Sequence, residues 1–401
     1  MVTILVLALL SAVAPLATDM YLPGFPQMAE DLATNAASVQ LTLTSFMIGL
    51  AGGQLVIGPL SDRFGRRRPL LIGTALAILA GALCVVAPNI ETLIALRTVQ
   101  GFGGAAGVVL ARSIISDRTD DETVTARLFQ VMTMIGGLAP VLAPSAGTGI
   151  VAVAGWRGVF AVITGLSILS FVGVVRFIGE SLPREQRSDA GLGPLWDSIR
   201  QLLGNREYVG YTLVAGFSFM ALYGYISASP FVFQTVLGLT PTEFSIAFGT
   251  NAAGMMASAA LSARLVSRIG PRRQTGFGLV LLLAASFALM ACVLAGAGPM
   301  WVLPAVFLTL ASVGLILGNA SALAILRAPL FAGTASAVLG AAQFGLGALV
   351  SPLVGLGGEE DPVPMAIAIV AAALLASACF WLLTKAETAP TSPATSPPQS
   401  L

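Results

Sequence analysis

The 401-residue sequence contains no histidine, and only 10% of its residues are charged. Without imidazole there is no histidine metal ligand, no Ser-His-Asp or Cys-His nucleophile system and no histidine proton relay. The cysteines, Cys84, Cys292 and Cys379, occur singly inside apolar runs, which argues against disulfides and thiolate metal sites. A net charge of +1 argues against nucleic-acid binding, and the lack of a GxxxxGK[ST] loop argues against an ATP-driven pump.

Hydrophobic residues make up 56% of the chain and charged residues 10%. In a typical soluble protein about a quarter of the residues are charged. Apolar runs recur along nearly the whole sequence, each long enough to cross a bilayer. They predict an all-α membrane protein with about twelve transmembrane helices, which start near residues 2, 40, 69, 92, 126, 157, 208, 242, 274, 299, 333 and 362. The first run lacks the features of a cleaved signal peptide, so we expect it to be a retained helix.

A weak internal repeat divides the chain into two halves. LSDRFGRRR (residues 60–68) follows the second predicted helix, and LVSRIGPRR (residues 265–273) follows the eighth, with Leu, Arg, Gly and two later arginines at matching places. The repeat predicts two pseudo-symmetric six-helix bundles, residues 1–179 and 208–385, joined by a linker at residues 180–207. The tail at residues 386–401 is rich in Pro, Ser and Thr and is expected to be disordered.

Basic residues are strongly asymmetric across the predicted helices. Nearly all of them, including those of the linker, fall on one side, while the other side carries Arg157 and several acidic residues. By the positive-inside rule this distribution predicts a multi-pass protein of the inner cell membrane with both termini in the cytoplasm.

Asp19 and Arg97 are the main candidates for chemistry, because they are the only acid and the only strong cation deep inside predicted helices. A charge in the bilayer costs at least a few kcal/mol, so such residues usually mark ion or substrate pathways. If the first helix runs from about Val2 to Met28, Asp19 and Arg97 lie at overlapping depths within reach of each other. Burial favours a neutral acid and a guanidinium favours a carboxylate, so Asp19 is expected to exchange a proton. The alternative is an ion pair that only holds two helices together.

Four segments in this order resemble the major facilitator superfamily and, within it, drug:proton antiporters of the bicyclomycin/chloramphenicol-resistance (Bcr/CflA) type. They are LATDMYLPGFP (16–26), GPLSDRFGRRR (58–68), LRTVQGFGGA (96–105) and GGLAPVLAPSAG (136–147). The resemblance covers nearly the whole chain. It implies the major facilitator fold, a substrate site between the bundles, roles for Asp19 and Arg97 in proton coupling, and no cofactor besides the proton gradient.

The resemblance also implies a cytoplasmic gate at the loop after the second helix. Asp62 is expected to face the N-terminus of the eleventh helix near Gly333 and Thr334, where the helix dipole stabilises an anion. Arg66 or Arg63 would pair with Asp117, and these contacts, which we call the latch, would favour the outward-facing state. The alternative is a solvated basic loop. The residues assigned to this gate are Gly58, Asp62, Arg63, Gly65, Arg66, Arg67 and Asp117.

The fifth predicted helix carries Gly136, Pro140, Pro144 and Gly147 at spacings that place them on one face. The prolines interrupt backbone hydrogen bonds, and the glycines allow a neighbouring helix to come close. In exporters that resemble this chain, such a pattern is associated with sealing the cavity, although ordinary helix packing would need the same residues.

Six residues are candidates for the substrate cavity. Apolar walls with a few polar groups suit variable amphipathic ligands; the alternative for each residue is an interhelical hydrogen bond or a lipid contact. The candidates are Phe219, Tyr223, Ile226, Asn251, Asn319 and Gln343.

The leading prediction is therefore a monomeric, proton-driven exporter of small amphipathic molecules, whose partners are its substrate, protons and the lipid bilayer. An exporter of an endogenous metabolite, such as an amino acid or a siderophore, is the alternative within transport. A receptor that has lost transport is a further alternative. An intramembrane enzyme is excluded because there is no nucleophile-base pair and no set of metal ligands.

Overall fold

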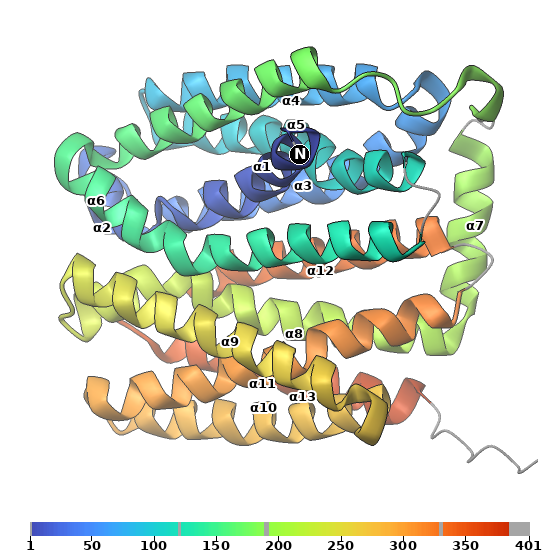
Figure 1. The fold of residues 1–401 in the computed structure, drawn as a ribbon. Helices are drawn as coiled ribbons and strands as arrows, with labels where there is room; N and C mark the ends of the chain where they lie inside the picture. Colours follow the sequence, from blue (N-terminus) through green and yellow to red (C-terminus); the bar gives the residue numbers. More distant parts are fainter. Residues whose placement is uncertain (1, 119–121, 188–191, 329–331, 385–401) are drawn as a thin grey trace, which may run out of the picture.

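The computed structural model describes residues 2–118, 122–187, 192–328 and 332–384, and of residues 2, 122–137, 186, 192–195 and 332 it describes the backbone only. Within these ranges the protein is almost entirely helical and contains no strand (Figure 1). The predicted disordered tail, residues 386–401, lies outside the described part of the chain.

The first half consists of long helices that alternate in direction between two ends of the molecule. Its elements are α1 (Val2–Asp19), a 3-10 turn (Leu22–Gly24), α2 (Phe25–Asp31), α3 (Ala36–Phe64), α4 (Arg67–Val85), α5 (Ile90–Asp117) and α6 (Glu122–Phe177). Helix α6 contains two crossings, because its backbone leaves helical geometry at Gly155, where φ is +64°. Only glycine adopts that left-handed conformation without strain.

The second half repeats this arrangement. Its elements are α8 (Arg206–Phe231), a π turn (Val232–Val236), α9 (Pro241–Ile269), α10 (Pro271–Leu294), α11 (Pro299–Leu326), α12 (Ala332–Gly355) and α13 (Val363–Leu383). Eleven described helices are long and apolar enough to cross a membrane, and one of them, residues 138–177, continues through the Gly155 kink into a second crossing. The predicted fold of twelve transmembrane helices in two six-helix bundles is confirmed.

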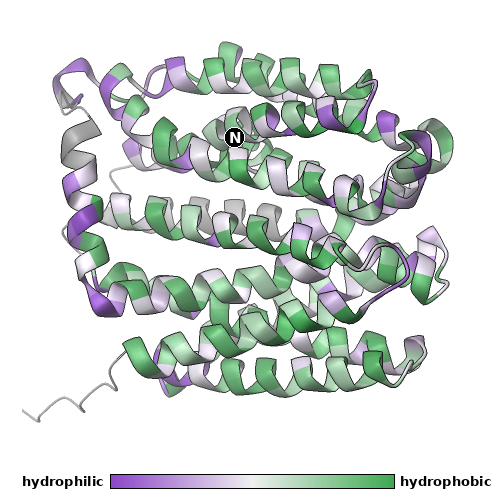
Figure 2. Ribbon diagram, turned by 180° about the vertical axis from the view of Figure 1, so that it is seen from behind, coloured by the Kyte–Doolittle hydropathy of each residue, from purple (hydrophilic) through white to green (hydrophobic). Residues whose placement is uncertain are grey.

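Most helices begin where local sequence signals place a start. Asn35 and Asn89 lie just before α3 and α5, and each side chain accepts a hydrogen bond from a backbone N–H of the first turn. Proline occupies the first position of α9, α10 and α11, where its missing N–H costs nothing. Figure 2 shows the result: hydrophobic residues follow the length of the helices, and hydrophilic residues gather at their ends.

The first helix is shorter than its sequence predicts. It ends at Asp19 instead of continuing to Met28, and a 3-10 turn and α2 follow it. Pro23 and Pro26 lack the N–H that a continuous helix needs at these positions, which accounts for the break. Asp19 is therefore the last residue of α1.

The linker contains a helix that was not predicted from its mixed composition. Helix α7 (Leu192–Gly204) stands across the ends of both halves at the right of Figure 1. Its apolar residues recur at helical spacing, which was the available signal. We refer to the end of the molecule that carries α7 as the linker end, and to the opposite end, which carries α2, as the far end.

Glycines allow α3 and α5 to pack backbone against backbone. A Cβ built on Gly101 would clash with the carbonyl of Phe46, and a Cβ on Gly49 would clash with the carbonyl of Thr98. Since lipid provides no hydrophobic drive for helix association, such close van der Waals contact is a main source of stability.

We expect Gly101→Val to destabilise the protein, because the valine would force α3 and α5 apart; overpacking of this kind typically costs about 1–3 kcal/mol. Gly104→Val is the matched control, since it adds the same side chain to the same helix where no atom lies within 4 Å. Thermal melting of the purified protein measures both, and equal melting temperatures would contradict the prediction.

Candidate functional site

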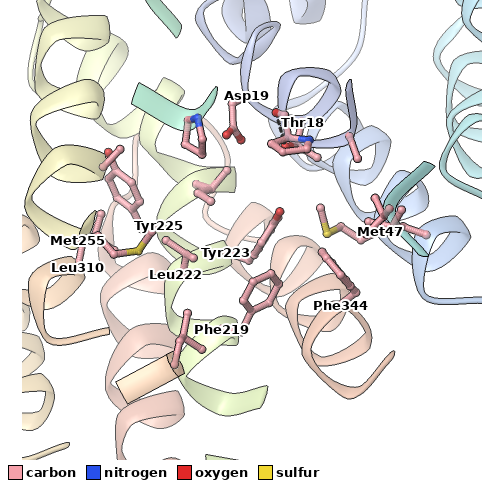
Figure 3. Close-up of a pocket in the computed structure, with 18 of the residues that line it drawn as sticks. Thr18, Asp19, Met47, Phe219, Leu222, Tyr223, Tyr225, Met255, Leu310 and Phe344 are labelled. Atoms are coloured by element: carbon pink, nitrogen blue, oxygen red, sulfur yellow. Dashed lines mark hydrogen bonds between the residues drawn. The ribbon is translucent and has the colours of Figure 1, made fainter. Parts of the chain in front are cut away.

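A cavity of about 430 Å³ lies between the two halves (Figure 3). Its walls come from α1, α3, α5 and α6 of the first half and from α8, α9, α11 and α12 of the second. Most lining side chains are apolar, with a few polar groups among them, and the size suits a small organic molecule. Because both halves supply its walls, any relative motion of the halves must change this cavity.

The cavity is closed at the far end. The rings of Phe25 and Phe231 lie 6.0 Å apart across the two halves. The hydroxyls of Thr148 in α6 and Ser245 in α9 are 2.5 Å apart, and Ser351 in α12 donates a hydrogen bond to the carbonyl of Gln40 in α3.

The linker end lacks such contacts at the residues of the predicted latch. A Cβ built on Gly58 or on Gly333 would meet no atom within 4 Å. The lining of the cavity also includes Arg112, in the part of α5 that approaches the linker end. The cavity is therefore open toward the linker end.

Asp19 lines the cavity although its side chain is almost fully buried. The residue is 3% exposed, and its carboxyl group points into the cavity from the end of α1 (Figure 3). Its Oδ1 has no hydrogen-bond partner, while the neighbouring Thr18 hydroxyl donates to the carbonyl of Pro15. An ionised carboxylate in this place would be costly without a partner, so the site favours either a protonated acid or a donor supplied from the cavity.

Arg97 forms no ion pair with Asp19, so the alternative of a pair that only holds two helices together is not seen. Its guanidinium donates to the carbonyls of Ala17 (2.9 Å) and Thr42 (3.4 Å) and to the side chain of Gln100 (2.7 Å). It also lies over three aromatic rings, at 4.2 Å from Phe46, 4.7 Å from Tyr21 and 5.5 Å from Phe160. Because α1 ends at Asp19, the free carbonyls of its last turn provide acceptors for the cation.

Two residues nevertheless hold the segment around Asp19 in place. Arg97 binds the carbonyl of Ala17, two residues before Asp19. Gly147 of α6 lies directly against the carbonyl of Met20, where any side chain would clash. Asp19 is thus positioned from both sides by α5 and α6.

The glycine and proline residues of α6 divide between three places. Pro140 lines the cavity, and the carbonyl of Pro144 accepts a hydrogen bond from Ser245 of the second half. Gly147 contacts the end of α1, as described above. Gly136 lies where only the backbone is described, so its predicted packing falls outside the described side chains.

The loop after α3 forms an ion-pair network within the first half. Arg66 contacts both Asp62 and Asp117, with its Nε 3.0 Å from Asp117, and it also donates to the Ser61 hydroxyl. Burial lowers the pKa of the Arg66 guanidinium, but hydrogen bonds and charges from Asp117 and Asp62 outweigh burial and hold that pKa above its usual value. The expected pairing of Arg66 with Asp117 is present.

The other predicted contact of the latch is not formed. The side chain of Asp62 is 51% exposed and pairs with Arg66 instead of facing the N-terminus of α12. The start of α12 is not packed against Asp62 in this conformation, since a Cβ built on Gly333 would meet no atom within 4 Å. Arg63 lies over the ring of Phe64, Arg67 donates to the carbonyl of Val175, and Gly65 adopts φ +89° at the turn.

Of the six candidates for the substrate cavity, Phe219, Tyr223 and Ile226 line it. The other three make interhelical hydrogen bonds instead. Asn251 donates to the Tyr225 hydroxyl, Asn319 donates to Ser262 and Gln274, and Gln343 donates to Ser321. An uncharged amide inside a helix is ambiguous in sequence, because helix neighbours satisfy it as well as a ligand does.

Several lining residues were not predicted. Most of them are ordinary apolar residues, and only the helix packing reveals which face of a helix turns toward the cavity. Tyr225 and Phe248 were accessible to prediction as aromatic residues close to Tyr223 in α8 or near the start of α9. The remaining unpredicted residues include Ser11, Met47, Arg112, Met255, Leu310, Leu317 and Phe344.

Comparison with known proteins identifies the family. The model of the Major Facilitator Superfamily matches residues 7–352. The chain belongs to this superfamily. It is 35% identical over 382 residues to an uncharacterized MFS-type transporter, YdgK, of Bacillus subtilis (strain 168), covering 94% of each chain. It is 32% identical over 383 residues to a bicyclomycin resistance protein homolog of Haemophilus influenzae, covering 95% of this chain and 96% of the relative.

A solved D-xylose-proton symporter has the same fold, with a TM-score of 0.76 and 16% identity over 96% of this chain and 98% of the other. These findings confirm the resemblance indicated by the four motifs. The chain is a membrane transporter of this superfamily and not an enzyme.

We expect Ser245→Ala to weaken closure of the far end, because the alanine cannot hydrogen-bond with Thr148 or Pro144 across the two halves. Loss of one such bond costs about 1 kcal/mol, enough to shift a population several-fold. Thr250→Ala is the control, since that hydroxyl only bonds within α9. Distances between spin labels at Glu91 and Ala295 report far-end opening, and identical distributions in both variants would refute the effect.

Proposed function

We propose that this transporter exports small amphipathic compounds in exchange for protons, by alternating access. The observation that carries the proposal is Asp19, whose unpartnered carboxyl oxygen faces a largely apolar cavity that both halves line. The resistance-protein name of the Haemophilus influenzae relative supports antibiotics as one class of substrate.

Competition between proton and substrate for Asp19 would couple the two fluxes. In the conformation described here the cavity is open at the linker end, and a substrate that enters displaces the proton of Asp19 by offering a cation or a hydrogen-bond donor. After the halves rearrange, a proton arriving from the far end neutralises Asp19 and releases the substrate. Because Asp19 binds either a proton or a substrate, protons cannot cross the membrane without substrate moving in the opposite direction.

Arg97 would act in this scheme as a positioning residue. Its hydrogen bond to the Ala17 carbonyl fixes the last turn of α1, so the carboxyl group of Asp19 stays directed into the cavity. The latch would form in the opposite conformation, when the linker end closes and the exposed Asp62 carboxylate reaches the N-terminus of α12.

The linker end is proposed to face the cytoplasm, because almost all basic residues gather there. With this orientation the structure is an inward-open exporter, ready to load substrate from the cytoplasm.

To test the orientation, the three native cysteines are replaced and one new cysteine is introduced in each of two variants. The new cysteine stands at Gln201 in α7 or at Glu360 at the far end. Both positions are exposed. In intact cells an impermeant maleimide should label Glu360→Cys and spare Gln201→Cys until the membrane is permeabilised. Labelling of the α7 position from outside would reverse the proposed orientation.

Asp19→Asn should abolish protonophore-sensitive efflux while binding of neutral substrates persists, because asparagine keeps the size and polarity but cannot exchange a proton. Glu30→Gln is the control, since it removes an exposed carboxylate at the same end outside the cavity. The measurement is pH-resolved dye efflux from proteoliposomes, together with proton release from purified protein on substrate addition. Full proton-coupled efflux by Asp19→Asn would refute the mechanism.

A further inference from the structure

A second cavity, of about 490 Å³, lies at the linker end, away from the transport cavity and entirely within the first half and the start of the linker. Four arginines line it: Arg67 and Arg68 at the start of α4, and Arg184 and Arg187 in the linker. We call it the arginine pocket. It belongs to the hydrophilic region next to α7 in Figure 2.

The one acidic residue in the lining, Glu180, is already occupied. Its Oε1 accepts hydrogen bonds from the backbone N–H groups of Arg66 (2.7 Å), Ser181 (3.1 Å) and Leu182 (3.2 Å). Its Oε2 lies 3.6 Å from Nη2 of Arg187. One carboxylate therefore faces four guanidinium groups, and the pocket keeps a clear excess of positive charge.

Donors in the pocket also lack acceptors. The Nε atoms of Arg67 and Arg187 are buried and make no hydrogen bond, although each side chain donates through Nη2 to a backbone carbonyl. Arg68 and Arg184 are exposed, and no hydrogen bond of their side chains is present within the described ranges. The exposed guanidinium groups of Arg68 and Arg184 can therefore donate to a ligand with several acceptor oxygens.

The residue that corresponds to Arg67 in the second half has internal partners. Arg272 matches Arg67 in the internal repeat, and it donates to the Tyr211 hydroxyl and to both the hydroxyl and the carbonyl of Thr384. The two halves therefore differ at this repeat position, because Arg67 keeps a buried Nε without a hydrogen bond and Arg272 does not.

We propose that the arginine pocket binds a phosphate group. Guanidinium forks match phosphate oxygens in pairs, and several of them together suit a dianionic or diester phosphate better than a single carboxylate. Arg67 begins a membrane-crossing helix, so the pocket lies at headgroup depth, where the phosphate of an anionic lipid or a free phosphate can both reach it.

A bound phosphate would join α4 to the linker. Arg67 and Arg68 belong to the helix, whereas Arg184 and Arg187 belong to the segment that leads to α7. Occupancy should therefore hold the start of the linker against the first half and raise the stability of that half. The inference is independent of the transported substrate and of proton coupling.

The test uses the full chain purified in a neutral detergent, titrated with dihexanoyl phosphatidylglycerol, dihexanoyl phosphatidylcholine and inorganic phosphate. Binding is followed by calorimetry and by thermal melting. In Arg184→Gln/Arg187→Gln we expect affinity to fall at least about tenfold. Arg268→Gln/Arg273→Gln is the matched control, because it removes two exposed arginines from the related loop of the second half.

Saturable binding that only the pocket variant loses supports the proposal. Preference for phosphatidylglycerol would identify a lipid headgroup as the source, and equal binding of inorganic phosphate would identify a free phosphate. Equal loss in the control variant, or no saturable binding of either anion, would overturn the site. Arg184→Lys/Arg187→Lys, which keeps the charge, guards against misfolding: if its melting temperature is native and its affinity is unchanged, charge alone and not the guanidinium fork accounts for binding, which also contradicts the proposal.

Discussion

The Arg97 guanidinium, buried without an acidic partner in the first half, is the interaction on which the site depends. A charged arginine inside a bilayer is expensive, and here backbone carbonyls of α1 and α3, one side-chain amide and three aromatic faces share that cost. One of the acceptors is the carbonyl of Ala17, which α1 leaves free because the helix breaks at Asp19. The hydrogen bond from Arg97 thus holds the end of α1, and Asp19 with it, against α5.

Close packing gives this arrangement its precision. Gly101 and Gly49 bring α3 and α5 into backbone contact, and Gly147 brings α6 onto the carbonyl that follows Asp19. These contacts lie within the first half and leave no room for adjustment. The boundary between the halves combines close packing with a cavity: Gly355 and Gly340 of α12 lie against α3, hydroxyls and aromatic rings meet at the far end, and the cavity lies between the halves. Two internally packed halves around a shared cavity can rock against each other, which the proposed alternating access requires.

The ion pairs at the linker end fit the same division. Arg66, Asp117 and Ser181 connect α3, α5 and the linker inside the first half, so they persist whichever way the halves are tilted. Asp62 is the exception, because it is half-exposed and is the acid of this network directed at the second half in the predicted latch. In the proposed latch, Asp62 would exchange Arg66 for the N-terminus of α12, a small energetic step between two states of the transporter.

The sequence by itself determined that the chain spans a membrane, how many times it crosses, and to which family it belongs. These features depend on local signals: runs of apolar residues, asparagine and proline at helix starts, and the repeated loop motif. It also singled out Asp19 and Arg97, since charges are rare in such a composition. Their mutual geometry was not local: the break after Asp19 gave Arg97 a carbonyl acceptor, and the two residues form no ion pair. Likewise, only the packing of α8 to α12 decided that Tyr223 lines the cavity while Asn319 bonds to Gln274. A buried amide can hydrogen-bond with a neighbouring helix or with a ligand, and the sequence does not distinguish the two.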